Sequence, residues 1–362
     1  MKHKKQVLFV GSFKSKAKDG TVGGQMFACR SLINSIISDK VEWLLVDSTA
    51  DSNIIQTKWK RLSKACKRLF LFLKYLVFRN VDTCLIFTAD GLSFVEKGIM
   101  VLLSKVFQKK TILAPRSGVV INDINNSRFM RFYIPFILKK ADFIICQGES
   151  WRRFYFGLVG SDEAKFITIQ NWIDTSEYFV LDNRSSENIV NVLFLAWVEK
   201  SKGIIDLINA AYRLDNSNIF FHIAGDGNAM AEAKKLVEDY SLTEKFIFYS
   251  WVHNNQKLEL LGKTNIYVLP SYFEGFPNAL MEAMASKCAV VATRVGGIVD
   301  LIVNKENGLL FDAGDVNSLA ENLKLLADDK PLRDMLALNA RNTISRNNTI
   351  DIAVEKMEPL LI

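Results

Sequence analysis

The chain has 362 residues, of which 49% are hydrophobic and 23% are charged. Globular proteins have this composition, and a chain of this length usually divides into two domains. Its five cysteines are scattered and form no C-x-x-C pair, which argues against a disulfide framework or a zinc site and indicates a reducing compartment.

The apolar stretches are too short for membrane insertion. The longest, Leu69 to Phe78, carries Lys74 and has about half of the ~20 residues that a membrane-spanning helix needs. The N-terminal run VLFV is shorter than the core of a signal peptide. We therefore expect a cytoplasmic protein without a transmembrane span.

Positive charge is concentrated in the first half of the chain. Up to Val180 there are 28 Lys and Arg against 15 Asp and Glu, a net charge of +13, and the remainder has a net charge of −6. Such a half suits nucleic acid or an anionic lipid surface. No nucleic-acid recognition motif accompanies the charge, so we do not expect a nucleic-acid partner.

In the first half, short aliphatic strands alternate with helical patterns. The predicted strands are VLFV, VEWLLV, TCLIFT, TILAP and FIIC, and helices are predicted at Gln25–Ile37, in the basic segment Thr57–Arg79, at Glu96–Phe107 and between TILAP and FIIC. This alternation is typical of βαβ units around a parallel sheet.

The basic segment Thr57–Arg79 mixes cations with aromatic and aliphatic residues, as a helix at a membrane interface does. An ordinary amphipathic helix with a solvated basic face has the same periodicity, so both interpretations stay open. The residues predicted to face a membrane are Lys58, Trp59, Lys60, Arg61, Lys64, Lys67 and Arg68.

The second half repeats the rhythm of the first. Strands are predicted at NVLFLAW, IFFHIAG, FIFYSW, IYVLP and AVVAT, with helices at Gly203–Leu214, Ala229–Tyr240, around Gln256–Gly262, after Asn278 and at Ser318–Asp328. The polar segment 176–190 is predicted to link the two halves. We expect an α/β protein with two Rossmann-like, doubly wound parallel-sheet domains, 1–175 and 191–345, the first completed by a helix over 346–362.

Glycines cluster at the ends of predicted strands in both halves, where ligands bind in such sheets. Turn formation explains a single glycine, but the recurrence indicates close approach of backbone to a ligand. No G-x-G-x-x-G or P-loop spacing occurs. The glycines are Gly11, Gly23, Gly24, Gly118, Gly225, Gly227, Gly275, Gly296 and Gly297.

Two carboxylates flank the predicted start of a helix in PSYFEGFPNALMEA. Glu274 lies in the loop, and Glu282 follows one turn after Asn278, where the first N–H groups of the helix form an anion site. Glu282 is suited to the hydroxyls of a ribose, and Glu274 to hydroxyls beyond the phosphates. Acidic residues at helix starts and in loops also occur without a ligand, because they complement the helix dipole or are solvated.

The stretch from Pro270 to Ile302, followed by NGLLF, resembles the nucleotide-sugar signature of the GT-B glycosyltransferases, specifically the retaining family 4. Glu274 and Glu282 fill the E-x7-E motif of that family. The resemblance implies that the donor is bound by residues of both halves: Gly23, Gly24, Trp197, Lys202, Gly225, Trp251, Val252, Gly275, Phe276, Pro277, Asn278, Ala279, Leu280 and Glu282.

The chain departs from the family pattern at three positions. Trp197 stands where an arginine grips the diphosphate together with the lysine matched by Lys202, and Trp172 stands where glycine is more usual. The sequence APRSG after the strand TILAP lacks the histidine that contacts the transferred sugar. Arg116 is the expected substitute, unless it merely faces a partner carboxylate.

The resemblance implies a retaining transfer of a hexose-type sugar from a UDP- or GDP-sugar to a saccharide, with Glu274, Arg116 and Lys202 as catalytic residues. No D-x-D or other metal pattern occurs, so metal-independent transfer is expected. The basic first half favours a lipid-linked acceptor of bacterial surface polysaccharide or lipopolysaccharide synthesis, and a monomer or weak dimer at the inner face of the plasma membrane. A sugar-nucleotide epimerase of the same fold and a non-catalytic nucleotide-sugar-binding protein remain alternatives.

Overall fold

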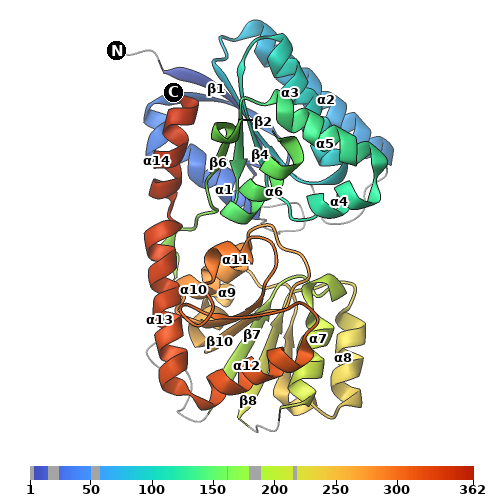
Figure 1. The fold of residues 1–362 in the computed structure, drawn as a ribbon, viewed down its shortest axis with the longest axis vertical. Helices are drawn as coiled ribbons and strands as arrows, with labels where there is room; N and C mark the ends of the chain where they lie inside the picture. The colour runs from blue at the N-terminus through green and yellow to red at the C-terminus, as the bar shows by residue number, and fades with distance from the viewer. Residues whose placement is uncertain (1–3, 15–23, 50–57, 161, 179–188, 215–217) are drawn as a thin grey trace. The chain divides into compact units, whose positions relative to one another are not determined.

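A computed structural model describes residues 4–14, 24–49, 58–160, 162–178, 189–214 and 218–362. They form two compact units, Met1–Trp172 with Ile350–Ile362, and Ile173–Thr349 (Figure 1). Most of the predicted linker, 176–190, lies outside the described residues. Gly23, predicted to bind the donor, also lies outside them.

The first unit is a six-stranded parallel sheet in the order β2-β1-β3-β4-β5-β6. Side chains alternate across the sheet, because Leu8 and Val10 pack on one face and Val7 and Phe9 on the other. The strands are β1 (Lys5–Gly11), β2 (Val41–Asp47), β3 (Thr83–Thr88), β4 (Lys110–Pro115), β5 (Phe143–Cys146) and β6 (Phe166–Thr168).

Helices cover both faces of this sheet. The core beneath Leu8 includes residues of α2, α3, α5 and α6, and the core beneath Phe9 includes residues of α1 and α14. A fully buried strand such as β3, with the sequence TCLIFT, is what a sheet covered on both faces requires. The helices are α1 (Gly24–Ile33), α2 (Lys58–Phe78), α3 (Gly91–Val106), α4 (Val120–Asn126), α5 (Arg128–Lys140), α6 (Glu149–Val159) and α14 (Ile350–Leu361).

The second unit is also a six-stranded parallel sheet, in the order β12-β11-β10-β7-β8-β9. The strand order reverses between β10 and β7, so the loops that follow these two strands diverge and leave space for a ligand. The strands are β7 (Val190–Leu195), β8 (Ile219–Ala224), β9 (Phe246–Tyr249), β10 (Ile266–Leu269), β11 (Ala289–Thr293) and β12 (Leu309–Phe311).

In the second unit, the helices α7, α8 and α12 pack on one apolar core of the sheet, and α10 contacts α13. Asp329 caps α13, because its carboxylate accepts a hydrogen bond from the Leu332 N–H at 2.9 Å. The helices are α7 (Ile204–Tyr212), α8 (Met230–Asp239), α9 (Asn254–Lys263), α10 (Asn278–Ala285), α11 (Ile298–Leu301), α12 (Val316–Asp328) and α13 (Lys330–Asn347). The predicted α/β class with two parallel sheets is confirmed.

Candidate functional site

The loops after β7 and β10 meet at the point where the strand order of the second unit reverses. The Tyr272 N–H donates a hydrogen bond to the Ser201 carbonyl at 2.9 Å, which ties the two loops together. Lys202, in a 3-10 turn after β7, thereby lies beside Glu274 in the loop after β10. The distance from Lys202 Nζ to Glu274 Oε1 is 2.7 Å, and the buried Ser271 hydroxyl donates to the same oxygen at 2.7 Å.

Glu282 on α10 is held by a second lysine. Lys257 Nζ, from α9, lies 2.8 Å from Glu282 Oε1, and the Tyr178 hydroxyl also donates a hydrogen bond to Glu282. Burial raises the pKa of Tyr178 well above its usual range, and the negative charge of Glu282 raises it further. The sequence contains no motif that marks Lys257 or Tyr178, since both lie far from Glu282 along the chain.

The two predicted carboxylates are therefore both mostly buried and both paired with lysine ammonium groups. The side chains of Glu274 and Glu282 are only 10% and 16% exposed. Glu274 is therefore not a solvated loop glutamate, which was the alternative to a ligand-binding role. Each carboxylate keeps acceptor capacity beyond its lysine bond, because an ionised carboxylate offers about four lone-pair sites.

Glycine is required here mainly where two backbones touch. At Gly296, φ is +50°, and a Cβ would lie 1.8 Å from the Glu274 carbonyl oxygen. At Gly225, φ is +142°, and a Cβ would lie 1.9 Å from the Ala196 carbonyl oxygen. Packing of neighbouring loops thus explains both glycines, and the donor contact at Gly225 stays a prediction.

The remaining predicted donor residues surround the same edge of the sheet. The Trp197 and Trp251 rings pack together, with centroids 4.7 Å apart, and Val252 is buried beside them. The side chains of Phe276 and Leu280 are buried, so a side-chain contact with a ligand is not expected at these two positions. The Gly297 N–H donates to the Gly275 carbonyl at 2.9 Å. Pro277 precedes Asn278 and Ala279 at the start of α10 and gives no side-chain cap.

Arg116, which directly follows β4 in the first unit, contacts two aromatic rings. Its guanidinium carbon lies 4.7 Å from the centroid of Phe87 and 5.3 Å from that of Trp172. The Nη1 atom is buried and donates no hydrogen bond among the described residues. Burial lowers the pKa of Arg116 to about 10, which leaves it charged at neutral pH. The alternative prediction was that Arg116 faces a partner carboxylate. Within the described part of the chain, Arg116 forms no ion pair.

The basic segment forms α2, which has one buried and one exposed side. Phe72 and Leu76 pack in the core, while Lys60, Arg61 and Lys67 are exposed, Trp59 is 81% exposed and Lys64 is half-buried. The side chain of Lys58 lies outside the described residues. Gly24, predicted to bind the donor, is the exposed first residue of α1.

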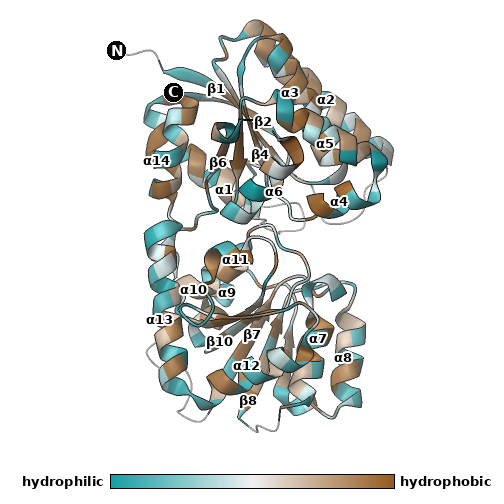
Figure 2. Cartoon of the chain, viewed as in Figure 1, coloured by the Kyte–Doolittle hydropathy of each residue, from teal (hydrophilic) through white to brown (hydrophobic). Residues whose placement is uncertain are grey.

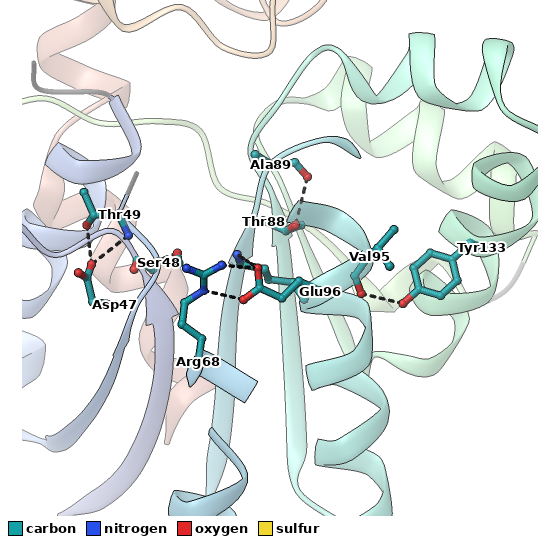
Figure 3. Close-up of polar contacts among 11 residues, drawn as sticks. Asp47, Ser48, Thr49, Arg68, Thr88, Ala89, Val95, Glu96 and Tyr133 are labelled. Carbon is teal, nitrogen blue, oxygen red and sulfur yellow. Dashed lines mark hydrogen bonds and ion pairs between the residues drawn. The ribbon is translucent and has the colours of Figure 1, made fainter. Parts of the chain in front are cut away.

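Arg68 does not belong to the exposed cations, and its predicted membrane contact is corrected. Its Nε and Nη2 atoms donate to both oxygens of Glu96 on α3, at 2.6 and 2.7 Å (Figure 3). The Glu96 side chain is only 8% exposed and also binds Lys97 Nζ at 3.2 Å. Arg68 points inward because a buried carboxylate needs a cationic partner.

Within the described residues, no helix combines the length and the apolar composition that a membrane-spanning segment needs. The His, Cys, Asp and Glu side chains of these residues form no group of three or more that could hold a metal ion.

Comparison with known proteins identifies relatives of this chain. Residues 181–343 match the family model of glycosyl transferases group 1. The chain is 27% identical over 311 residues to the Campylobacter jejuni N-acetylgalactosamine-N,N'-diacetylbacillosaminyl-diphospho-undecaprenol 4-alpha-N-acetylgalactosaminyltransferase, covering 82% of each chain. It is 28% identical over 207 residues to the Escherichia coli UDP-Gal:alpha-D-GlcNAc-diphosphoundecaprenol alpha-1,3-galactosyltransferase, covering 56% of this chain and 52% of that one.

Solved structures share the fold over almost the whole chain. Sucrose-phosphate synthase from Thermosynechococcus elongatus superimposes with a TM-score of 0.80 at 17% identity, covering 99% of this chain and 98% of that one. HepE of Anabaena in complex with UDP superimposes with a TM-score of 0.76 at 16% identity, covering 99% of both chains. Residues 181–343 therefore form a glycosyl transferases group 1 domain, the relatives are named glycosyltransferases, and the two parallel-sheet units have the GT-B fold, so we conclude that the chain is a glycosyltransferase.

Proposed function

We propose that this enzyme is a retaining glycosyltransferase that moves a hexose-type sugar from a UDP- or GDP-sugar to a lipid-linked saccharide of bacterial surface polysaccharide or lipopolysaccharide synthesis. One observation carries the donor assignment: Glu274 and Glu282 lie at one edge of a parallel sheet, each mostly buried and each held by a lysine. Buried carboxylates with spare acceptor capacity suit a ligand that is rich in hydroxyl groups.

The positions of the two carboxylates suggest how a nucleotide sugar is arranged. Glu282 accepts hydrogen bonds from the ribose hydroxyls, while Tyr178 and Lys257 hold its carboxylate in place. Glu274 accepts hydrogen bonds from hydroxyls of the transferred sugar. The diphosphate lies between them, near Lys202 and the first turn of α10, where backbone N–H groups favour an anion. Trp197 and Trp251 offer aromatic faces for the base.

The same residues stabilise the transition state. When the bond between the sugar and the diphosphate breaks, negative charge grows on the leaving phosphate while the sugar acquires oxocarbenium character. Lys202 is already held 2.7 Å from Glu274, so its ammonium group needs little rearrangement to meet the growing charge. The charge of Glu274 stabilises the developing positive charge of the sugar.

Relatives and neighbours support the nature of both substrates. HepE of Anabaena binds UDP and UDP-glucose in its solved structures, which favours a uridine nucleotide. The named relatives from Campylobacter jejuni and Escherichia coli act on saccharides linked to undecaprenol diphosphate. A lipid-linked acceptor requires the enzyme to work at a membrane surface.

Exposed apolar residues on three neighbouring helices of the first unit support such a location. The helices α2, α3 and α5 pack side by side, and hydrophobic residues lie along all three (Figure 2). Exposed cations flank them on α2, which suits an anionic membrane at about 1 kcal/mol for each cation near the surface. The exposed apolar residues are Trp59, Leu62, Phe70, Leu73, Val77, Phe78, Leu92, Ile99, Val106, Phe129 and Phe132.

Thermal shift with a panel of nucleotide sugars tests the donor site. A ligand at about 100 times its dissociation constant stabilises the protein by about 2.7 kcal/mol. We expect a shift with UDP or GDP and its sugars in the wild type and none in Glu282→Ala. The control is Glu259→Ala, since Glu259 is also paired with a lysine but is exposed. An unchanged shift in Glu282→Ala contradicts the donor site.

Flotation with anionic vesicles tests the membrane surface. We expect the wild type to float with vesicles at low salt, and the triple change of Lys60, Arg61 and Lys67 to Glu to abolish flotation. Arg68 is excluded from this change because it pairs with Glu96. The charge-matched control changes Lys235, Lys263 and Lys330 of the second unit to Glu. Equal flotation of both triple variants argues against the surface on α2.

A further inference from the structure

Arg116 is half-buried, and the Nη1 atom of its guanidinium is completely buried. Its guanidinium carbon lies 4.7 Å from the ring centroid of Phe87 and 5.3 Å from that of Trp172, and both rings are almost completely buried. The Trp172 indole is fixed in turn, because its Nε1 atom donates to the Ser31 hydroxyl at 2.7 Å. Arg116 and Trp172 are also the two positions at which the first unit departs from the family pattern, and they contact each other.

No described acidic group compensates this charge. The titratable group that interacts with it is Cys29, and burial raises the pKa of the Cys29 thiol to about 12, so the thiol is neutral at pH 7. The carboxylates of the neighbouring loops bind elsewhere. Asp47 accepts from the Thr49 hydroxyl and the Phe13 N–H, Asp90 from the Ser117 hydroxyl, and Asp123 from the Gly91 N–H.

A buried charge without a counter-ion is costly for folding. Aromatic faces offset part of this cost, but they give no acceptor to the buried Nη1 atom. A ligand with a hydroxyl group would accept a hydrogen bond and leave the charge uncompensated. An oxyanion would satisfy both requirements, since a guanidinium matches the two oxygens of a carboxylate or a phosphate.

We propose that Arg116, in contact with the rings of Phe87 and Trp172, binds an oxyanion of a substrate. This inference rests on the proposed function, because the oxyanion is sought on a nucleotide sugar or on a lipid-linked acceptor. It has two chemical sources: a carboxylate on the transferred sugar, as in a uronic acid, or a phosphate of the donor or of the acceptor lipid.

Thermal shift of the wild type and Arg116→Met, with four probes, tests this site. The probes are UDP-glucose, UDP-glucuronate, inorganic pyrophosphate and geranyl diphosphate. Methionine fills the space between two rings and removes the charge. We expect the probe that carries the right oxyanion to bind about 10- to 100-fold more weakly to Arg116→Met, which is the range for hydrogen bonds to charged groups. Arg116→Lys should recover part of this loss.

The probes distinguish the sources. A sugar carboxylate predicts tighter wild-type binding of UDP-glucuronate than of UDP-glucose, with the difference lost in Arg116→Met. An acceptor phosphate predicts that geranyl diphosphate loses its shift in Arg116→Met but keeps it in Glu282→Ala. A donor phosphate predicts weaker binding of UDP-glucose in both variants and of pyrophosphate in Arg116→Met.

A second readout separates a binding role from a structural one. Without ligand, Arg116→Met should melt at the wild-type temperature or above it, because it removes an uncompensated charge. The control is Arg30→Met, an exposed arginine of the same unit. If Arg116→Met melts several degrees lower, or if every probe binds it as it binds the wild type, the inference is overturned. The proposed function would still stand if Glu282→Ala alone lost the nucleotide shift.

Discussion

The two units share a six-stranded parallel sheet but differ in how charge is balanced at its carboxyl edge. In the second unit, Lys202 is paired with Glu274, and Lys257 with Glu282. In the first unit, the Arg116 guanidinium has no described acidic partner. Where each lysine already has a carboxylate partner, a ligand that binds must replace or share that partner. Where a guanidinium has no acidic partner, the uncompensated positive charge attracts an anion. On the two proposals above, the same fold offers two kinds of binding site.

The outer surfaces differ in the same way. In the first unit, α2 alone exposes six large hydrophobic residues between Trp59 and Phe78, whereas α7 and α12 of the second unit expose one each, Tyr212 and Leu325. Large exposed apolar areas mark interaction surfaces. This contrast is what we expect if the first unit meets a charged, membrane-anchored partner and the second unit binds a hydroxyl-rich ligand.

The largest effect is expected from Lys202→Met, which removes the cation that we propose to stabilise the leaving diphosphate. We expect kcat to fall about 10²- to 10³-fold, the range for loss of one group that stabilises transition-state charge. Steady-state transfer assays check this. Lys200→Met is the matched control, because Lys200 lies in the same turn but is 68% exposed and pairs with Glu232. Comparable rates in the two variants would show that the ion pairs of the second unit have no catalytic role.

A stability effect of similar size is expected from Glu96→Gln in the first unit. Burial raises the pKa of Glu96, but Arg68 and Lys97 outweigh this effect and lower it, so the group is charged at pH 7. Removal of its charge leaves two neighbouring cations unpaired, which should reduce the free energy of unfolding by about 3 kcal/mol. Urea unfolding measures this, with the exposed Glu42→Gln as control. If Glu96→Gln lost less free energy of unfolding than Glu42→Gln, the Arg68–Glu96 pair would not stabilise the fold, and the contrast with the ion pairs of the second unit would fail.

Much of the fold follows from the sequence because buried parallel strands are continuous apolar runs. Of the twelve strands in the described residues, β6 and β12 have only three residues each, too few to show a pattern, so they are absent from the predicted strands. The helix α13 was also missed, because its sequence KPLRDMLALNARNTISRN has weak amphipathic periodicity. Tertiary packing, including contact with α10, decides its structure.

The candidate site was predictable only where a local motif marks it. Glu274, Glu282 and Lys202 lie in recognisable segments, and the structure brings Lys202 to Glu274. Tyr178 and Lys257 have no local signal, since only the packed fold brings them to Glu282. Arg68 was assigned to the wrong side of α2, because one periodicity places cations on a face but does not reveal a buried acid on another helix.

A smaller effect is expected from Tyr178→Phe, which removes one of the donors that position Glu282. We expect KM for the nucleotide sugar to rise about 3- to 10-fold with kcat nearly unchanged, because Lys257 still holds the carboxylate. Initial rates over a range of donor concentrations separate the two constants. Tyr240→Phe is the control, since its hydroxyl bonds Asn209 away from this site. A fall in kcat with KM unchanged would contradict a positioning role for Tyr178.

The smallest effect is expected from His222→Gln in the second unit. Burial favours the neutral form of His222, whereas Arg116 stays charged despite its burial. Burial, and then the charge of Lys263, lower the pKa of His222. Its ring nitrogens lie 3.1 Å from the Tyr249 hydroxyl and from Asn191 Oδ1.

Because the unfolded chain takes up a proton at His222 near pH 6.5 and the folded chain only at lower pH, stability should fall as the pH drops through that window. When the pH is lowered from 7.5 to 5.5, we expect the free energy of unfolding to fall by a few tenths of a kcal/mol less in His222→Gln than in the wild type. The difference is small because solvent partly screens the half-buried ring. Urea unfolding at both pH values measures the difference, and the exposed His253→Gln is the control. If the wild type and His222→Gln lose equal stability, His222 is not a neutral buried base, and the contrast with Arg116 does not hold.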